Sequence, residues 1–111
     1  MTQMTFDEFQ ELSSETAIYD PRWALMYPAL GFAGEAGEVC NKVKKVFRDD
    51  GGHCTAEVRD SLAKELGDCL WYLSALATDL DLKLDDIARG NRDKLDSRKE
   101  RGVLGGSGDN R

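Results

Sequence analysis

The sequence has no long hydrophobic run, only two prolines and one histidine, and an odd number of cysteines, three. A membrane-spanning helix needs about 20 consecutive apolar residues, and the polar opening MTQMTFDEFQ lacks the apolar core of a signal peptide. Three cysteines without paired spacing argue against a disulfide framework and against a cysteine-rich metal site. We therefore expect a cytoplasmic protein with reduced thiols that does not enter a membrane.

An excess of positive charge is also lacking, because 21 acidic residues outnumber 15 basic ones and the formal net charge is -6 at pH 7. Broad binding to nucleic acid or to an anionic membrane needs a basic surface, so neither is expected as a partner. A nucleotide is not excluded, because a bound metal ion can invert the local charge. With 111 residues, 41% of them hydrophobic and 32% charged, the chain is expected to form one globular domain with a modest core.

Apolar residues recur at helical spacing and show no convincing strand alternation, which predicts an all-α fold. A capping box at Thr5–Glu8 begins the first helix, and Pro28 lies in the first turn of the second. The expected helices span residues 5–16, 28–47, 55–79 and 85–98, with an irregular connection over 18–28 and a turn-rich loop over 48–54. Residues 1–100 are expected to form the domain, and residues 101–111 a flexible tail.

The second and third helices are the longest, and the short loop between them favours an antiparallel pair within a compact bundle of about four helices. Each carries an apolar row, formed by Phe32, Ala36, Val39, Val43 and Val46 on one and by Leu62, Leu66, Cys69, Leu73, Leu76 and Leu80 on the other. Leu70, Trp71 and Ala75 lie off the row of the third helix. A helix that is apolar on two sides usually buries both, so we expect a homodimer or homotetramer, with Trp71 in the core or an interface.

The segment GEAGEVCNKVKK, residues 34–45, carries a polar row roughly opposite the apolar one. Residues three or four apart are neighbours on a helix. Glu35, Glu38, Lys42 and Lys45 therefore share one side of the second helix.

The third helix repeats this spacing in KELGDCLWYL, where Glu65 and Asp68 are three residues apart and Tyr72 follows one turn later. Two antiparallel helices would present four carboxylates to one another, and unneutralised like charges destabilise a fold. A divalent cation relieves this repulsion, and carboxylate oxygens suit Mg²⁺ or, as a substitute, Mn²⁺. The sequence therefore predicts a metal site between the two helices.

Two features of these helices have more than one interpretation. Gly34, Gly37 and Gly67 adjoin the carboxylates, and each costs about 0.5–1 kcal/mol relative to alanine inside a helix. They indicate either close helix packing or room for a ligand against the backbone. Glu38 and Lys42 have the favourable i,i+4 order of a solvated pair, which is what an ordinary exposed acidic face would show.

The segment GFAGEAGEVCNKVKK followed by LAKELGDCLWYL resembles the MazG-like family of nucleoside triphosphate pyrophosphohydrolases, within the wider all-α pyrophosphatase group. The family pattern of ExxE, a spacer and ExxD is matched by Glu35 and Glu38 and then by Glu65 and Asp68, and the resemblance covers residues 18–98. It implies an oligomeric all-α fold and Mg²⁺-dependent hydrolysis of (deoxy)nucleoside triphosphates to the monophosphate and pyrophosphate. Such an enzyme would clean or balance the nucleotide pool.

Roles for single residues come from the same resemblance. The family's metal ligands, which are also its catalytic carboxylates, match Glu35, Glu38, Glu65 and Asp68. Its phosphate-binding polar segment matches Asn91 and Lys94, and its sugar- or base-contacting position matches Tyr72. The full set of substrate-binding candidates is Lys42, Lys45, Tyr72, Asn91, Lys94, Arg98 and Trp23, the last because it precedes the second helix and could stack on a base.

Several alternatives stay open from the sequence. Relatives with similar carboxylates cleave dUTP, dCTP or phosphoribosyl-ATP, so the base and the sugar are not defined. A non-catalytic regulator that binds metal and nucleotide is a second class, and a structural helical oligomer is a third. The carboxylate that positions the attacking water is also left open between Glu35 and Glu38.

Overall fold

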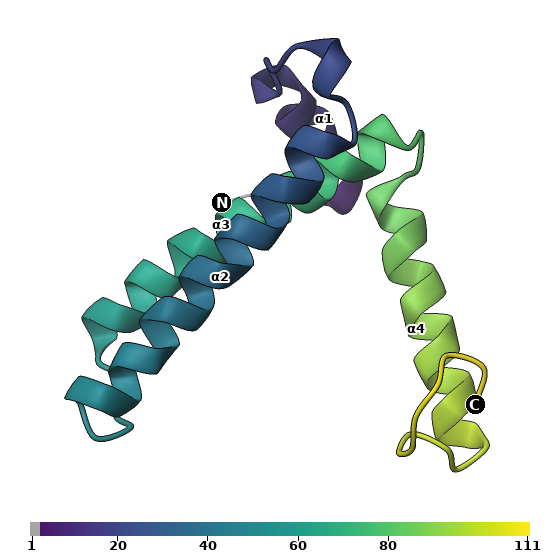
Figure 1. Ribbon diagram of the computed structural model, residues 1–111. Helices are drawn as coiled ribbons and strands as arrows, with labels where there is room; N and C mark the ends of the chain where they lie inside the picture. The colour runs from purple at the N-terminus through teal and green to yellow at the C-terminus, as the bar shows by residue number, and fades with distance from the viewer. Residues whose placement is uncertain (1–2) are drawn as a thin grey trace.

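The computed structural model describes residues 3–111, which form four α-helices and one short 3-10 helix and contain no strand (Figure 1). The elements are α1 (Phe6–Thr16), η1 (Pro21–Trp23), α2 (Met26–Asp49), α3 (Ala56–Asp79) and α4 (Leu84–Glu100). The predicted all-α class is confirmed, and each helix boundary lies within a residue or two of its expected position. Within this part of the chain, no helix combines the length and the apolar character needed to cross a membrane.

Side-chain caps begin α1 and α3. The Thr5 hydroxyl accepts a hydrogen bond from the Glu8 N–H (3.1 Å), and the Thr55 hydroxyl accepts one from the Val58 N–H (3.2 Å). These bonds satisfy N–H groups that have no partner within the first turn of a helix. Pro28 lies in the first turn of α2, as predicted, and is buried there without interrupting the helix.

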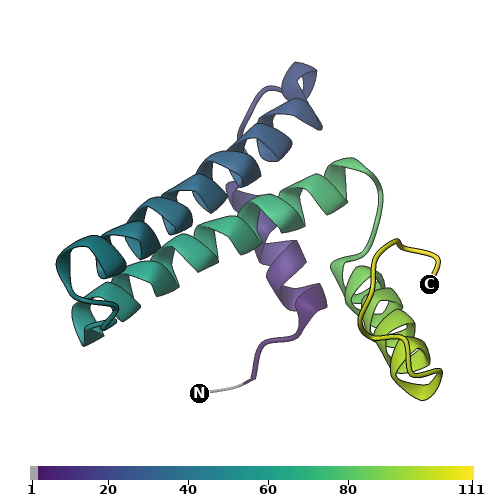
Figure 2. The same ribbon diagram turned by 60° about the horizontal axis from the view of Figure 1, so that its bottom comes forward.

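Helices α2 and α3 lie side by side, and residues 50–55 join them at one end (Figures 1 and 2). Gly31 on α2 adjoins the Tyr72 ring on α3, and further along α2 the Lys42 ammonium bonds to Ser61. Residue numbers therefore fall along α3 as they rise along α2. We refer to this pair of helices as the hairpin.

Asp79 holds the beginning of α2 to the end of α3. Its carboxylate accepts hydrogen bonds from the Tyr19 hydroxyl (2.8 Å) and from the Leu25 N–H (2.9 Å). Burial and this hydrogen bond raise the pKa of Tyr19 to about 12. Leu25 has a left-handed backbone (φ 69°), which a branched side chain rarely adopts, and the bond to Asp79 restrains it in that conformation.

The connection from α3 to α4 is held by Gln10 of α1. The Gln10 amide donates to the Leu82 carbonyl (2.9 Å) and accepts from the Leu84 N–H (2.8 Å) at the start of α4. Asp81, with φ 57°, turns the chain between the two helices. Helix α4 therefore packs on α1 and extends away from the hairpin (Figures 1 and 2), and the radius of gyration is 17.0 Å. A closely packed domain of about 100 residues has a value of about 13 Å.

Few apolar side chains are buried within the described chain. The buried ones are Pro28, Val46, Ala75, Ala77 and Leu84. Of the two apolar rows predicted to form the core, only Val46 is buried, whereas Leu66 is 58% exposed and Phe32 and Leu73 are each more than one-third exposed. The rows lie at helical spacing as expected, but the other described residues leave most of their side chains partly or largely exposed.

Close approach of the hairpin helices occurs at Gly31, a glycine that the sequence pattern does not single out. A Cβ added there would overlap the Tyr72 ring. At Gly34, Gly37 and Gly67 an added Cβ would meet no atom within 4 Å. These three glycines are therefore not sites of close helix packing within the chain, which leaves open space beside the carboxylates.

We expect opposite effects when the two kinds of glycine are replaced by alanine. Gly31→Ala should lower the free energy of unfolding by about 1–3 kcal/mol, because the Tyr72 ring must move. Gly34→Ala should raise it by about 0.5–1 kcal/mol, because the open site accepts the methyl group and alanine favours the helix. Urea denaturation followed by circular dichroism measures both changes. Equal effects in the two variants would contradict this description of the hairpin.

Candidate functional site

Three of the four predicted carboxylates meet between the hairpin helices. Glu35 on α2 and Glu65 and Asp68 on α3 each place one carboxylate oxygen within 4.8 Å of the other two. The three-residue spacing puts Glu65 and Asp68 on the same side of α3, and the pairing of the helices brings Glu35 to them. We call these three residues the carboxylate cluster. Glu38 lies one turn further along α2, is exposed, and is outside the cluster.

The pKa values of Glu35 and Glu65 are displaced in opposite directions. The hydrogen bond to Glu65 is the main cause that raises the pKa of Glu35, followed by burial and the charges of the neighbouring carboxylates. The pKa of Glu65 is lowered, mainly by its hydrogen bond to Lys42 and then by that to Glu35. Glu35 is therefore the member of this pair that more readily carries a proton, while Glu65 stays ionised.

Lys42 reaches across the hairpin to the cluster. Its ammonium donates to the Ser61 hydroxyl (2.6 Å) and to a Glu65 carboxylate oxygen (2.8 Å). The two charged side chains are only 28% and 17% exposed, so this ion pair is better shielded from water than a typical surface pair. An ordinary solvated face would show Lys42 paired with Glu38 on its own helix. Lys42 pairs instead with Glu65 on the other helix.

An open hollow of about 420 Å³ adjoins the carboxylate cluster and is lined by Thr16, Glu35, Asp68, Trp71 and Tyr72. The Trp71 indole N–H donates to the Thr16 hydroxyl (2.7 Å), and the Trp71 and Tyr72 rings meet edge to face with centroids 5.1 Å apart. Burial is the first cause that raises the pKa of Tyr72. The hollow is thus lined by two carboxylates and two aromatic rings.

Trp71 is a site residue that the sequence analysis assigned to the core or an interface. It is half-buried and lines the hollow beside Asp68. One signal in the sequence could have located it, because Trp71 follows Asp68 by three residues and therefore shares its side of α3. Thr16 carries no such signal, since it reaches the hollow only through the packing of α1 on α3.

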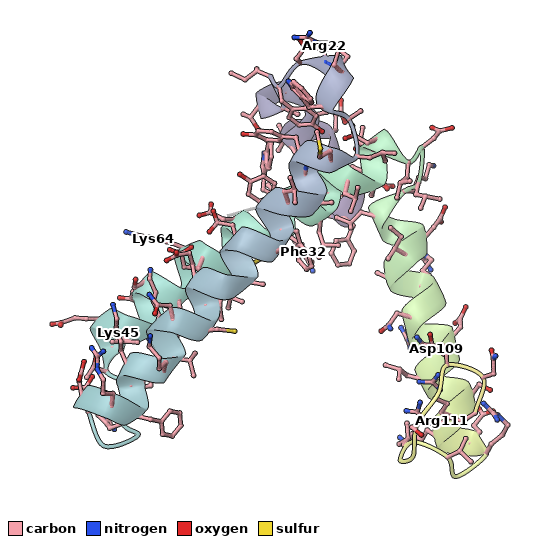
Figure 3. The ribbon with its side chains drawn as sticks, in the orientation of Figure 1. Arg22, Phe32, Lys45, Lys64, Asp109 and Arg111 are labelled. Carbon is pink, nitrogen blue, oxygen red and sulfur yellow. The ribbon has the colours of Figure 1, made fainter. Side chains whose placement is uncertain are left out.

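Lys45 and Trp23, two of the other predicted substrate-binding residues, lie outside the hollow. Lys45 lies on α2 beyond Lys42, near the loop end of the hairpin (Figure 3). Trp23 is in η1, where the Arg22 guanidinium stands 5.5 Å from its ring centroid.

The remaining three candidates lie on α4, away from the hairpin (Figure 1). Asn91 and Lys94 are exposed. Arg98 is only 5% exposed, and its guanidinium donates to the Asp109 carbonyl (2.8 Å) of the segment that follows the helix. The chain's own fold therefore does not bring these residues to the carboxylate cluster.

The carboxylate cluster fits a hard divalent cation. All of its donor atoms are carboxylate oxygens, which suit Mg²⁺ and Mn²⁺ and not softer metals. Among residues 3–111, Lys42 pairs with Glu65 alone of the three carboxylates, so this ion pair balances only part of the negative charge of the cluster. Open backbone at Gly34 and Gly67 leaves room for water or phosphate beside the cluster.

The fold and the site define an all-α protein with a carboxylate cluster between two paired helices. A family model for the MazG nucleotide pyrophosphohydrolase domain matches residues 28–103, and the chain belongs to this family, as its motifs predicted. The chain is also 49% identical over 114 residues to the Gene 37 protein of Mycobacterium phage L5, an alignment that covers 97% of this chain and 100% of that protein. No solved structure matches it.

We expect Lys42→Met to raise the pKa of Glu65, because the ammonium hydrogen bond is the main cause of its lowered value. A carboxyl group with a lowered pKa in the folded state stabilises the fold above its unfolded pKa, and loses this effect as the pH falls through the folded value. The variant should therefore be less stable than the parent at neutral pH, and the difference should shrink in acid. Carboxyl NMR titration and urea denaturation over pH 3–7 measure the two effects.

Lys44→Met is the matched control, because Lys44 is an exposed lysine on the same helix that makes no ion pair among residues 3–111. It should leave the pKa of Glu65 unchanged. An unchanged Glu65 midpoint in Lys42→Met would contradict the interhelical ion pair.

Proposed function

We propose that this protein hydrolyses (deoxy)nucleoside triphosphates to the monophosphate and pyrophosphate with Mg²⁺, for which Mn²⁺ can substitute. The observation that carries this proposal is the carboxylate cluster, which adjoins a hollow lined by Trp71 and Tyr72. Membership of the MazG family supports the reaction class. The free cysteines and acidic charge suit a cytoplasmic enzyme of the nucleotide pool.

Glu35, Glu65 and Asp68 would hold the metal ion, because their oxygens already converge. When bound, Mg²⁺ neutralises phosphate charge and makes a water molecule more acidic. Glu38, which lies one turn away with an exposed carboxylate, would hold and deprotonate the water that attacks the α-phosphorus. This assignment gives the four carboxylates two different roles.

The substrate would lie with its base in the hollow and its phosphates along the polar row of α2. Trp71 and Tyr72 present apolar ring surface to a base or a sugar. Lys42 would leave Glu65 for a phosphate oxygen once a cation balances that carboxylate, and Lys45 would meet the outer phosphates. The preferred base is left to a direct comparison of substrates that includes dUTP, dCTP and phosphoribosyl-ATP.

The decisive test is a hydrolysis panel over all ribo- and deoxyribonucleoside triphosphates, with Mg²⁺ and with a chelator. We expect pyrophosphate and monophosphate as products, and no turnover with the chelator. Glu35→Gln and Glu38→Gln should each lower kcat by at least about 100-fold. Even residues that only hydrogen-bond to a metal ligand change metal affinity or activity by about 10–100-fold. Metal titration by calorimetry should show weaker binding in Glu35→Gln and nearly unchanged binding in Glu38→Gln.

Glu11→Gln is the control for these variants, because Glu11 is an exposed glutamate on α1 outside the site. Nucleotide and metal binding without turnover would favour the regulator instead of the enzyme. The absence of both kinds of binding would leave only a structural role.

We also propose that the working protein is a homodimer or a pair of such dimers. The apolar rows of α2 and α3 keep exposed members along the hairpin, with Leu66 58% and Phe32 37% exposed. Burying such rows against a second copy contributes about 25 cal/mol for each Å² of apolar surface. A second hairpin presents the same rows and so provides a matching apolar surface.

We expect Leu66→Asp to dissociate the assembly, because a carboxylate would be placed in its apolar interface. Light scattering after gel filtration should give at least twice the 12.3 kDa chain mass for the parent and a single-chain mass for the variant. Leu104→Asp, at an exposed leucine beyond the end of α4, should leave the mass of the assembly unchanged. A monomeric parent protein at micromolar concentration would refute the proposed assembly.

A further inference from the structure

Lys42 places a positive charge of the chain itself at the carboxylate cluster. Its ammonium donates to a Glu65 oxygen (2.8 Å) and to the hydroxyl of Ser61 (2.6 Å), which lies about one turn before Glu65 on α3. Both partners belong to the opposite helix, so the side chain crosses the hairpin to reach them. Two hydrogen bonds therefore fix the ammonium beside an oxygen of the cluster.

This ion pair differs from the other ion pairs of the described chain. Every other pair among residues 3–111 joins side chains at most four residues apart in the sequence, and its basic member is at least 59% exposed. The pair of Lys42 and Glu65 joins two helices and is more shielded. Water and salt weaken such a pair less than a surface pair, so we expect the bonded state to predominate in the free protein.

The bond from Lys42 opposes a metal ion at the same place. Glu65 is one of three residues whose carboxylate oxygens converge within 4.8 Å. Its bonded oxygen already shares a lone pair with the ammonium, and the ammonium charge repels any cation brought to the cluster. A metal ion would therefore bind at full strength only in molecules where Lys42 has released Glu65.

A phosphate group favours the same released state. An ammonium that leaves a carboxylate needs another anionic acceptor, and a phosphate oxygen accepts a charge-assisted hydrogen bond. Ser61 would keep the ammonium within reach, because a hard cation beside three carboxylates does not require this neutral hydroxyl. The lysine ammonium has three N–H donors, so Lys42 can hold Ser61 and bind a phosphate at the same time.

We propose that Lys42 couples the two ligands of the site: bound to Glu65 in the free protein, it weakens the binding of a metal ion or a phosphate group alone and favours their binding together. This inference rests on the proposed hydrolase function and adds to it how the site is regulated. Each ligand alone binds only the released molecules, so its apparent affinity falls in proportion to their fraction. Coupling is reciprocal, so the metal ion and the phosphate group strengthen each other by the same factor. Ser61 acts through Lys42 as a positioning residue.

The first test is a Mn²⁺ titration of the nucleotide-free protein, in which the electron paramagnetic resonance signal reports free Mn²⁺. We expect Lys42→Met to bind Mn²⁺ about 10-fold more tightly than the parent, because a hydrogen bond to a charged group shifts an equilibrium by about this factor or more. A lysine that only oriented Glu65 as a metal ligand would have the opposite effect, since its loss would weaken metal binding. Unchanged or weaker Mn²⁺ binding in Lys42→Met would overturn the proposal.

The second test measures the coupling itself with inorganic triphosphate, which carries the phosphates of any nucleoside triphosphate and no base. Its dissociation constant is measured by ³¹P NMR, once with a chelator and once with saturating Mg²⁺. Mg²⁺ should strengthen triphosphate binding in both proteins, but by a factor about 10-fold smaller in Lys42→Met than in the parent. An equal factor in the two proteins would show that Lys42 does not couple the ligands.

Ser61→Ala tests the positioning role without changing a charge. The hydroxyl bonds the ammonium whether or not Glu65 is released, so Mn²⁺ affinity should stay close to that of the parent. Binding of triphosphate with Mg²⁺ should weaken by about 3-fold or more, and Ser61→Thr should restore it. A residue with a merely structural role would not separate the two affinities, and an equal change in both would remove Ser61 from the proposal.

Lys44→Met is the control, because it removes the same charge from an exposed position of α2 that makes no ion pair among residues 3–111. It should change neither Mn²⁺ binding nor the effect of Mg²⁺ on triphosphate binding. The Mn²⁺ titration requires no turnover, so its result is independent of the proposed hydrolase. Tighter Mn²⁺ binding by Lys42→Met in a protein that hydrolyses no nucleotide would support the competition and refute the enzyme. Nucleotide hydrolysis by the parent without tighter Mn²⁺ binding in Lys42→Met would do the reverse.

Discussion

The concentration of negative charge between α2 and α3 is the constraint on which the rest of the molecule depends. Glu35, Glu65 and Asp68 bring their oxygens within 4.8 Å of one another, at a place where the two helices are held together. Like charges at this separation must be balanced by protons, by cations or by neighbouring ammonium groups. The protein uses one of these means, since Lys42 pairs with Glu65. A bound divalent cation would be another, and it would convert a source of repulsion into a binding site for phosphate.

The helices that carry this charge stay paired because their remaining contacts are specific. Tyr72 packs against the bare backbone of Gly31, and Asp79 bonds the segment that begins α2. These contacts lie on one side of the cluster and the Lys42 bonds lie on the other. Contacts that involve no like-charge repulsion therefore hold the two helices together on both sides of the cluster. They fix the geometry of the cluster without a large apolar core.

The scarcity of buried apolar surface is the second constraint. A chain of this size buries a limited fraction of its surface, and here the fully buried residues of α3 are the small ones Ser74, Ala75 and Ala77. Several large apolar side chains of the hairpin remain exposed, among them Phe32, Phe47 and Leu66. The assembly that we propose would cover them.

Local patterns in the sequence determined the helices, their caps and the membership of the acidic row. Thr5 and Thr55 cap the helices, and Glu65 and Asp68 share a side of α3, because these relations span three residues and depend only on helix geometry. Tertiary structure alone decided that Gly31 and not Gly34 meets the other helix, that Glu38 stands apart from the cluster, and that Trp71 lines the hollow. It also decided the direction of α4, which rests on the bond from Leu84 to Gln10, 74 residues earlier in the chain. Helical periodicity assigns a residue to a side of its own helix, but only packing between distant segments decides what that side meets.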